Sequence, residues 1–528
     1  MKKIIRIGFI VDQCVSVPWW YAQTIKKTLS QDNVSAFFLV IHHRTINEKA
    51  PIAYSLFKKF EQWWFKPTYD AFADIKISSL VSEPQYIHFS SQQFFLNEGE
   101  LNRLKQYQLH LIYTINFNGK DEENLSQAAI HGLWYIKFGH DKYAGIKPEG
   151  FWEVIENSPI SGSYLLTRKN NVDHILYNGT TRSVPFSVKN NFTFLAWKSS
   201  SYLGHKLYQL SENENHFSQS DTEIYKQDGD YKNLPGNFTM TFFIVRNLFR
   251  YLLRKVKKTK PFKLFFSPAN FNITNLNLIK FNQLPLTPGS FFADPFVIRQ
   301  NDLYYVFFEE FIYSKDKGHI SLLVINQKNQ VSSPKLILDK PYHMSYPFVF
   351  SHSGNFYMVP ETSSDRTVQL YKAKAFPDEW EFVMNLMENR QLIDVTLLFE
   401  NGKWWLFALE QDDNPAISAN DQLFLFYSDD LFSSNWIPHP QNPVATHINN
   451  CRPAGRLFKY NSKLYRPAQN NASRRYGAGL KINEVILLNE KEYVEKEASA
   501  IENTVHGLQA CHHIDFAENM IIIDGIPK

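Results

Sequence analysis

The chain contains 528 residues, of which 44% are hydrophobic and 20% charged, and it carries a net charge of +4. This composition excludes wholesale disorder, and the length predicts at least two domains. The small net charge argues against nucleic acid as a partner. The cysteines Cys14, Cys451 and Cys511 are too far apart for a zinc ribbon or a disulfide framework, which favours a cytoplasmic protein.

The first 210 residues alternate apolar runs with helical patterns. Apolar runs at 4–11, 34–41 and 109–113 are typical of buried parallel strands, and a helical stretch follows Pro18. No run reaches the ~18 apolar residues that a membrane-spanning helix needs. We therefore expect a domain with an open α/β sheet over residues 1–210.

A series of short motifs lies towards the end of this domain. Gly-Leu-Trp-Tyr-Ile-Lys-Phe-Gly-His-Asp at 132–141 precedes Gly-Phe-Trp-Glu at 150–153, Ser-Gly at 161–162 and Val-Asp at 172–173. Their order resembles the formyltransferase fold found in bacterial surface-polysaccharide gene products. That resemblance implies an N-formyltransferase that uses formyl-tetrahydrofolate to modify an amino-sugar nucleotide.

The resemblance also implies which side chains would act. Formyl transfer needs an Asn, a His and an Asp that polarise the formyl group and handle the amine proton. Tyr135 stands at the Asn position and Lys137 at the His position, whereas Asp173 is retained; His140 and Asp141 are the candidate substitutes. The alternative is a domain of this fold that serves for binding or as a scaffold.

A polar linker and a basic amphipathic helix are predicted at 211–262. Arg246, Arg250 and Arg254 share one face of a helix over 242–260, and apolar residues fill the other side. One interpretation is peripheral attachment to an anionic membrane surface, at the inner face of the plasma membrane. The other is an interdomain helix whose apolar face packs on a neighbouring part of the protein.

Residues 263–528 contain a strand pattern that recurs about every fifty residues. Each unit opens with a polar or aromatic residue near the start of a strand. An aromatic-rich second strand follows, and it ends in an acidic or amide residue. Five such units predict a five-bladed β-propeller, because one four-stranded sheet cannot cover both of its faces alone. The innermost strands then bring their opening residues to one mouth of a central channel: Asp294, Tyr346, Asp394, Arg452 and His506.

Several segments of this half resemble known carbohydrate-active families. Ala-Asp-Pro-Phe at 293–296 is similar to the first blade of the glycoside hydrolase family 43 clan. His-Met-Ser-Tyr-Pro at 343–347, Trp-Trp-Leu-Phe at 404–407 and Arg-Pro-Ala-Gly-Arg at 452–456 resemble the propeller of glucosamine inositolphosphorylceramide transferases. The resemblance spans residues 290–528 and implies a propeller that binds or transfers a sugar.

Chemistry at an anomeric carbon commonly uses two carboxyl groups. The predicted central pair is Asp294 and Asp394, with Glu361 and Glu410 as further candidate acids. The hydrolase clan has a Glu at the blade-four opening where this chain has Arg452, and a guanidinium suits the phosphate of an activated sugar. We therefore expect glycosyl transfer from a phosphate-activated donor, in bacterial surface-polysaccharide synthesis.

Further side chains are predicted to contact the sugar nucleotide or glycan substrate: Tyr346, His506, Arg456 and Gln469. Two alternatives stay open at this point. In one, Arg452 and Asp394 form a purely structural ion pair; in the other, the propeller is a non-catalytic glycan-binding scaffold. His506, His512 and His513 match no strong metal-ligand motif, so no metal is predicted.

Overall fold

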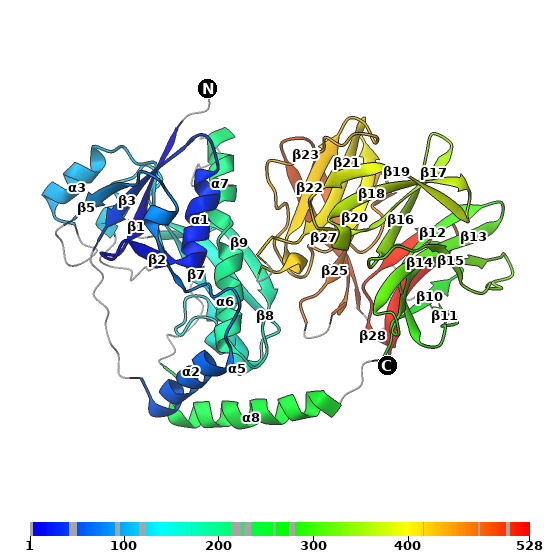
Figure 1. The fold of residues 1–528 in the computed structure, drawn as a ribbon, viewed down its shortest axis with the longest axis horizontal. Helices are drawn as coiled ribbons and strands as arrows, with labels where there is room; N and C mark the ends of the chain where they lie inside the picture. Colours follow the sequence, from blue (N-terminus) through cyan, green and yellow to red (C-terminus); the bar gives the residue numbers. More distant parts are fainter. Residues whose placement is uncertain are drawn as a thin grey trace. The chain divides into compact units, whose positions relative to one another are not determined.

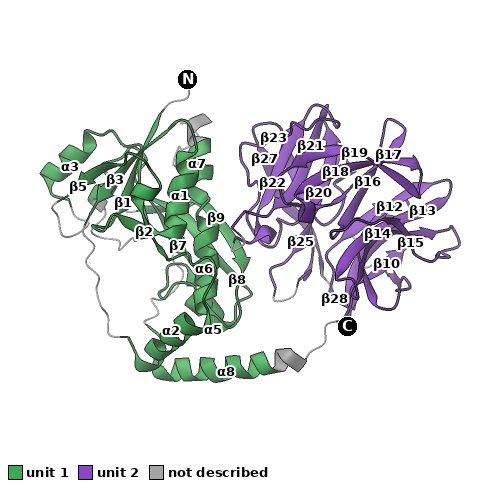
Figure 2. Cartoon of the chain, viewed as in Figure 1, with its two compact units in different colours: residues 1–257 green, residues 258–528 purple. Residues whose placement is uncertain are grey.

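The computed structural model describes residues 4–528 apart from the segments 42–49, 90–95, 116–122, 170–171, 213–222, 226–233, 257–259, 274–279, 415–416, 474–475 and 503–506 (Figure 1). The chain divides into two compact units, residues 1–257 and 258–528 (Figure 2). The helix predicted in the linker thus belongs to the first unit. None of the helices described is long and apolar enough to cross a membrane.

The first unit is built on a seven-stranded sheet with the order β5-β3-β1-β6-β7-β8-β9. The pairings from β5 through β7 are parallel, whereas β8 and β9 add an antiparallel edge. Its strands are β1 (Ile5–Val11), β3 (Val34–Val40), β5 (Gln85–His88), β6 (Leu111–Thr114), β7 (Leu133–Phe138), β8 (Ile160–Lys169) and β9 (Val172–Arg182). A short separate pair joins β2 (Ser16–Pro18) to β4 (Asp74–Lys76). The predicted α/β class is confirmed.

The helices of this unit begin at recognisable local signals. Asn97 and Glu100 form a reciprocal capping box at the start of α3, and the Ser187 side chain accepts a hydrogen bond from the Asn190 backbone at the start of α6. The helices are α1 (Trp19–Leu29), α2 (Ile52–Trp64), α3 (Glu98–Lys105), α4 (Glu123–Ser126), α5 (Phe151–Glu156), α6 (Val188–Ser199), α7 (Tyr202–Glu212) and α8 (Asn237–Val256).

The second unit is a five-bladed β-propeller, as the repeat predicted. Four blades are four-stranded antiparallel sheets formed in chain order. The first is β12 (Ser290–Gln300), β13 (Leu303–Ile312), β14 (Lys317–Ile325) and β15 (Lys335–Leu338); the second is β16 (Ser345–His352), β17 (Asn355–Glu361), β18 (Thr367–Ala375) and β19 (Glu379–Glu388). The third is β20 (Leu392–Glu400), β21 (Lys403–Glu410), β22 (Leu423–Ser428) and β23 (Ile437–Pro438); the fourth is β24 (Phe458–Tyr460), β25 (Lys463–Asn470), β26 (Gly479–Leu488) and β27 (Tyr493–Glu502).

The fifth blade combines strands from both ends of the unit. β28 (Leu508–Ala510), β29 (Ile514–Ala517) and β30 (Met520–Pro527) come from the chain's last residues, and β10 (Lys263–Ser267) and β11 (Asn282–Gln283) come from the start of the unit. β10 pairs with β30 along its whole length, from Lys263 opposite Gly525 to Ser267 opposite Ile521. This pairing closes the ring, so the two terminal strands protect each other's edges.

The innermost strand of every blade is interrupted near its start. Extra residues break the pairing at Asp294, Tyr346 and Asp394 in the first three blades, and β24 is preceded by a break that includes Gly455. At Gly455 the backbone φ is +130°, and a Cβ there would lie 1.9 Å from the Ile514 carbonyl oxygen, so only glycine fits. In the fifth blade the break between β28 and β29 contains His512, whereas His506 lies outside the described residues.

Arg466 and Glu495 form a buried ion pair between β25 and β27 and provide a test of the blade architecture. Arg466 donates to both carboxylate oxygens of Glu495, at 2.8 and 2.7 Å, and Tyr493 donates to the same carboxylate.

We predict that Glu495→Gln lowers the free energy of unfolding by about 3 kcal/mol, because it leaves a buried guanidinium without its counter-charge. Lys463→Ala breaks the exposed Lys463–Glu484 pair of the same blade and should cost less than about 1 kcal/mol in urea titrations. Equal effects would contradict this assignment.

Candidate functional site at the propeller axis

The interruptions in the inner strands place polar side chains in unusual backbone conformations. Asp294, Tyr346 and Asp394 have φ values of 52°, 43° and 54°, a region that non-glycine residues rarely adopt. Backbone strain of this kind costs about 1–3 kcal/mol per residue and is concentrated at functional sites. A bulge also redirects the side chain that it carries, which here brings residues of distant sequence together.

Asp394 and Arg452 form the central ion pair. Nε of Arg452 donates to Oδ2 of Asp394 at 2.6 Å, and Nη2 donates to Oδ1 at 3.4 Å. Nη1 donates to the Asn420 side chain at 2.7 Å, and the guanidinium lies 5.2 Å from the centre of the Tyr476 ring. The Asp394 side chain is 1% exposed and that of Arg452 is 18% exposed, so Arg452 is the member of this pair that meets solvent.

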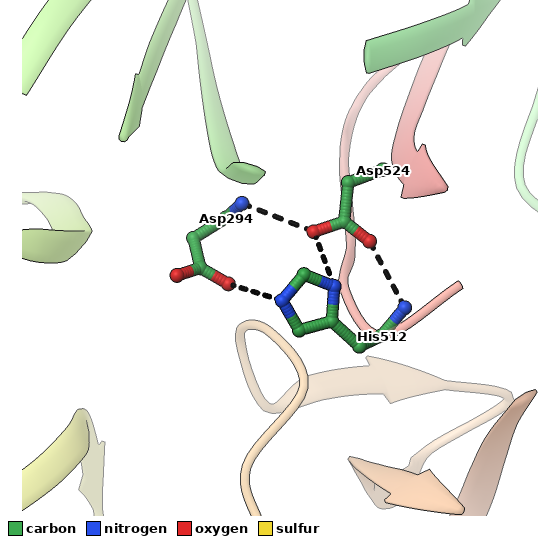
Figure 3. Close-up of side chains that lie close together, drawn as sticks. All are labelled: Asp294, His512 and Asp524. Carbon is green, nitrogen blue, oxygen red and sulfur yellow. Dashed lines mark hydrogen bonds and ion pairs between the residues drawn. The ribbon is translucent and has the colours of Figure 1, made fainter. Parts of the chain in front are cut away.

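A second group connects Asp294 to His512 and Asp524 (Figure 3). Nε2 of His512 lies 3.5 Å from Oδ1 of Asp294, and Nδ1 lies 2.7 Å from Oδ2 of Asp524. The backbone N–H of Asp294 donates to Asp524 at 3.1 Å, and the backbone N–H groups of His512 and His513 donate to the other oxygen of the same carboxylate. Asp524 thereby holds the imidazole with one nitrogen directed at Asp294.

Two glutamates from the second strands complete the acidic cluster. Oε2 of Glu361 accepts from the backbone N–H of Asp394 at 3.3 Å, and Oε1 accepts from the Ser363 hydroxyl at 2.8 Å. Glu309 is buried, and its carboxylate interacts electrostatically with Asp294 and Glu361. We call Asp294, Glu309, Glu361, Asp394 and Asp524 the axial carboxyl cluster.

Burial and crowding alter the acidity of this cluster. Burial raises the pKa of Asp294 to about 7, with His512 opposing and Asp394 adding to the increase. Burial likewise raises the pKa of Asp394 to about 7, although Arg452 opposes it. The pKa of Glu309 is raised well above its ordinary value by burial and then by neighbouring carboxylates. Burial lowers the pKa of His512, but the Asp524 carboxylate reverses this and leaves it raised.

Other predicted substrate contacts are engaged within the protein. Tyr346 is fully buried; its hydroxyl bonds Thr396 at 2.8 Å and accepts from the Gly455 backbone at 3.0 Å. Gln469 is also fully buried and donates to the Pro453 carbonyl. Arg456 pairs with Asp515 and donates to the Val349 carbonyl, which links three blades. These contacts hold the blades around the axis.

Glu410 does not join the axial carboxyl cluster. Its two oxygens accept from Nε and Nη2 of Arg390 at 2.8 and 2.6 Å, and this pair stacks against Phe426 through the guanidinium. The prediction placed Glu410 at the mouth because it ends a second strand. The strand register explains the difference. Leu409 pairs with Ile393 at the interruption, and because side chains alternate along a strand, the next residue, Glu410, points to the opposite face of the sheet.

Several members of the site were not predicted as such from the sequence. Asn420 lies in a long connection that carries no repeat signal, whereas Glu309, Asp524 and Tyr476 stood in recognised segments without an assigned role. His512 lies in the break of the fifth blade, whereas His506, to which the repeat spacing assigned that place, is outside the described residues. The adjacent pair His512-His513 directly before an apolar strand was the signal available in the sequence.

The group Asp294, His512 and Asp524 is also the described cluster best suited to a metal ion, with ligand atoms within 4.8 Å of one another. Asp524 is the hydrogen-bonded member of this group, whereas Oδ1 of Asp294 and Nδ1 of His512 make ion-pair contacts but no hydrogen bond with the described residues. Asp524 accepts three backbone N–H groups, and its Oδ2 lies 2.7 Å from Nδ1 of His512.

The candidate residues of the first unit fall into two places. Lys137 lies on β7 with its ammonium 4.5 Å from the centre of the Tyr225 ring, and burial lowers its pKa. Asp173 is held by Arg168 through contacts of 2.8 and 3.2 Å. His140 and Asp141 contact each other at 3.0 Å in a separate turn. The N-formyltransferase interpretation stays a prediction.

A buried glutamate of the first unit is an additional titrating group. Glu153 on α5 belongs to the Gly-Phe-Trp-Glu motif, and burial raises its pKa to about 7. The backbone of His140 opposes this shift through a hydrogen bond. Glu153 therefore connects the helix α5 with the turn that carries His140 and Asp141.

Sequence comparisons concern the propeller. Residues 277–517 match the family described as glucosamine inositolphosphorylceramide transferase 1, N-terminal. A glucosamine inositolphosphorylceramide transferase 1 from Oryza sativa subsp. japonica is 34% identical over 238 residues, which are 43% of this chain and 31% of that protein. The chain thus spans about a third of the length of this relative.

Solved structures are similar at low identity. A family 117 glycoside hydrolase produced by the marine bacterium Zobellia galactanivorans is 12% identical, with a TM-score of 0.34, over 51% of this chain and 90% of that one. A family 43 β-xylosidase/α-arabinofuranosidase from a compost microbial metagenome is 12% identical, with a TM-score of 0.29, over 39% and 73% of the two chains. The sequence match over residues 277–517 confirms the predicted resemblance of the propeller to glucosamine inositolphosphorylceramide transferases.

Proposed function

We propose that the propeller transfers a glycosyl group from a phosphate-activated sugar, in the synthesis of a bacterial surface polysaccharide. The observation that supports this proposal is the convergence of the axial carboxyl cluster with the guanidinium of Arg452 at the strained inner strands. The match to a transferase family over residues 277–517 supports the same reaction class. The surface-polysaccharide setting follows from the resemblance of the first unit alone.

The charge balance of the cluster favours a catalytic role over a purely structural one. Arg452 interacts with Asp394 and Glu361, and His512 interacts with Asp294 and Asp524. Glu309, which lies 3.6 Å from the His343 ring, is a fifth buried carboxyl group, so carboxyl groups outnumber Arg452 and His512. A structural ion pair is more stable when each buried charge has its own partner, as Arg466 and Glu495 have. Here the raised pKa values leave protonated and ionised carboxyls side by side near neutral pH, which supplies both a general acid and a general base.

In the proposed reaction Asp294 acts as the general base. The bond from the anomeric carbon to the donor phosphate oxygen breaks, and its electron pair leaves with the phosphate. The acceptor hydroxyl oxygen forms the new bond, and its proton passes to the Asp294 carboxylate. The partly exposed Arg452 stabilises the leaving phosphate, and the deeply buried Asp394 positions Arg452.

We predict that Asp294→Asn lowers the release of nucleoside diphosphate from nucleotide-activated sugars by at least about 100-fold, because the amide cannot accept the proton. Arg452→Lys should lower it by roughly 10- to 100-fold, since an ammonium retains the charge but not the planar fork. Chromatography of the released nucleotide, with a panel of donor sugars, measures both effects. Glu484→Gln on the outer part of blade four is the matched control and should retain activity within about threefold.

Binding measurements separate transfer from recognition. Isothermal titration calorimetry should give Asp294→Asn nearly the wild-type affinity for the donor, because the lost step follows binding. Full turnover by Asp294→Asn would refute its role as the base. Donor or glycan binding by the wild type without turnover of any activated sugar would instead identify a non-catalytic scaffold.

The raised pKa of Asp294 predicts how its substitution affects stability at different pH values. Between its ordinary pKa of 3.8 and about 7, the folded protein keeps a proton on Asp294 that the unfolded chain loses. The contribution of Asp294 to wild-type stability therefore falls as pH rises through this window, by up to ~1.4 kcal/mol per pH unit. An asparagine at this position cannot titrate, so Asp294→Asn should gain stability relative to wild type as the pH rises from about 4 to about 7.

Urea titrations of both proteins at several pH values measure this difference. Tyr346→Phe is the control, because it alters the equivalent interruption of the next blade without removing a carboxyl group. Its stability difference from wild type should stay constant over the same pH range. A constant difference for Asp294→Asn would show that Asp294 is ionised throughout.

A further inference from the structure

We propose that helices α2 and α8 of the first unit form a surface that binds the interface of an anionic lipid bilayer. α2 spans Ile52–Trp64 and α8 spans Asn237–Val256, and the two lie side by side in Figure 1. Phe57 and Phe243 meet edge to face at 5.5 Å, and the backbone of Ala53 donates to the Asn237 side chain at 3.0 Å. This proposal is independent of the glycosyl chemistry of the propeller.

Few of the apolar residues of α8 pack on the unit. Met240 and Phe243 are buried against α2 and α5, together with Phe151 and Trp152. A separate stripe at spacings of three and four residues is 55–87% exposed and consists of Phe238, Phe242, Val245, Phe249 and Leu252. The first unit therefore leaves this stripe of α8 uncovered.

α2, which packs on α8 through Phe57 and Phe243, carries a second exposed apolar stripe. Ile52, Leu56, Phe60, Trp63 and Trp64 are 48–73% exposed and recur at helical spacing. The rings of Phe60, Trp63 and Trp64 contact one another, with centroids 5.6–6.5 Å apart. Tryptophan prefers the boundary between lipid headgroups and acyl chains, where its apolar ring and polar N–H are both satisfied.

The charges around these stripes identify the partner as anionic. α8 contains no acidic residue, and Glu61, the acid of α2, is buried and accepts from the backbone N–H groups of Val188 and Lys189 at 2.8 and 3.0 Å. Lys58 and Lys59 are exposed cations of α2, and the half-buried Arg246 and Arg250 lie beside the stripe of α8, where Arg246 also donates to the Ile155 carbonyl. A second copy of the chain would oppose cations to cations, whereas an anionic bilayer complements them.

The geometry corresponds to helices lying in the plane of the membrane rather than crossing it. No described helix is suited to span a bilayer, and each stripe covers one side of its helix. Amphipathic helices with this distribution place their apolar face in the headgroup region and are held by apolar burial and cationic contacts together.

Co-sedimentation of the full chain with phosphatidylcholine vesicles that contain about 30% phosphatidylglycerol tests the proposal. We expect the wild type to bind these vesicles, and to bind pure phosphatidylcholine vesicles at least about tenfold more weakly. The combined variant Trp63→Ser, Trp64→Ser, Phe242→Ser, Phe249→Ser should lower the partition coefficient at least about tenfold. These side chains are exposed, so the fold should persist, which thermal unfolding checks.

A charge variant and a control complete the design. Lys58→Glu with Lys59→Glu should abolish the preference for anionic vesicles while leaving the apolar residues in place. Phe382→Ser with Phe399→Ser removes exposed phenylalanines of the propeller and should leave binding unchanged. Failure of the wild type to bind, or undiminished binding by the four-residue variant, overturns the proposal. Light scattering without vesicles tests the other partner. If the wild type is a dimer and the four-residue variant is a monomer, the surface binds a second copy of the chain instead.

Discussion

The interruption of each innermost strand is the constraint on which the propeller site depends. A continuous inner strand would direct alternate side chains into the packing between blades, and no polar group would be free to turn towards the axis. The break at Asp294, repeated at Tyr346 and Asp394, replaces ladder hydrogen bonds by contacts between blades. Asp524 compensates one such break by accepting the backbone N–H of Asp294 and those of the His512 segment.

The propeller contains two kinds of buried ion pair, which differ in charge balance and in exposure to solvent. Arg466 and Glu495 neutralise each other and are nearly inaccessible, so they act on stability. Arg452 shares Asp394 with a cluster that contains more carboxyls than cations, and part of its side chain reaches solvent. The first arrangement joins two strands of one blade, whereas the second places carboxyl groups of raised pKa beside a partly exposed guanidinium.

The resemblance-based expectations differ in how far geometry supports them. In the propeller, residues far apart in the sequence meet as the repeat implied, and the family match covers the same segment. In the first unit, Lys137 and Asp173 lie near each other, but Arg168 already neutralises Asp173 and His140 stands in another turn. The α/β class of that unit is therefore confirmed, while its chemistry stays a prediction.

The sequence by itself determined the α/β and propeller classes, because apolar runs and a fifty-residue repeat reflect burial within each element. It also placed Asp294 and Asp394 at equivalent positions, since these depend on local strand register, whereas Arg452 precedes the paired residue Pro453 of its blade. Only the tertiary structure decided that β10 closes the fifth blade, that His512 lies in the break of that blade, and that Glu410 pairs with Arg390. Those outcomes depend on pairing between distant strands, and a shift of one residue in register turns a side chain to the opposite face.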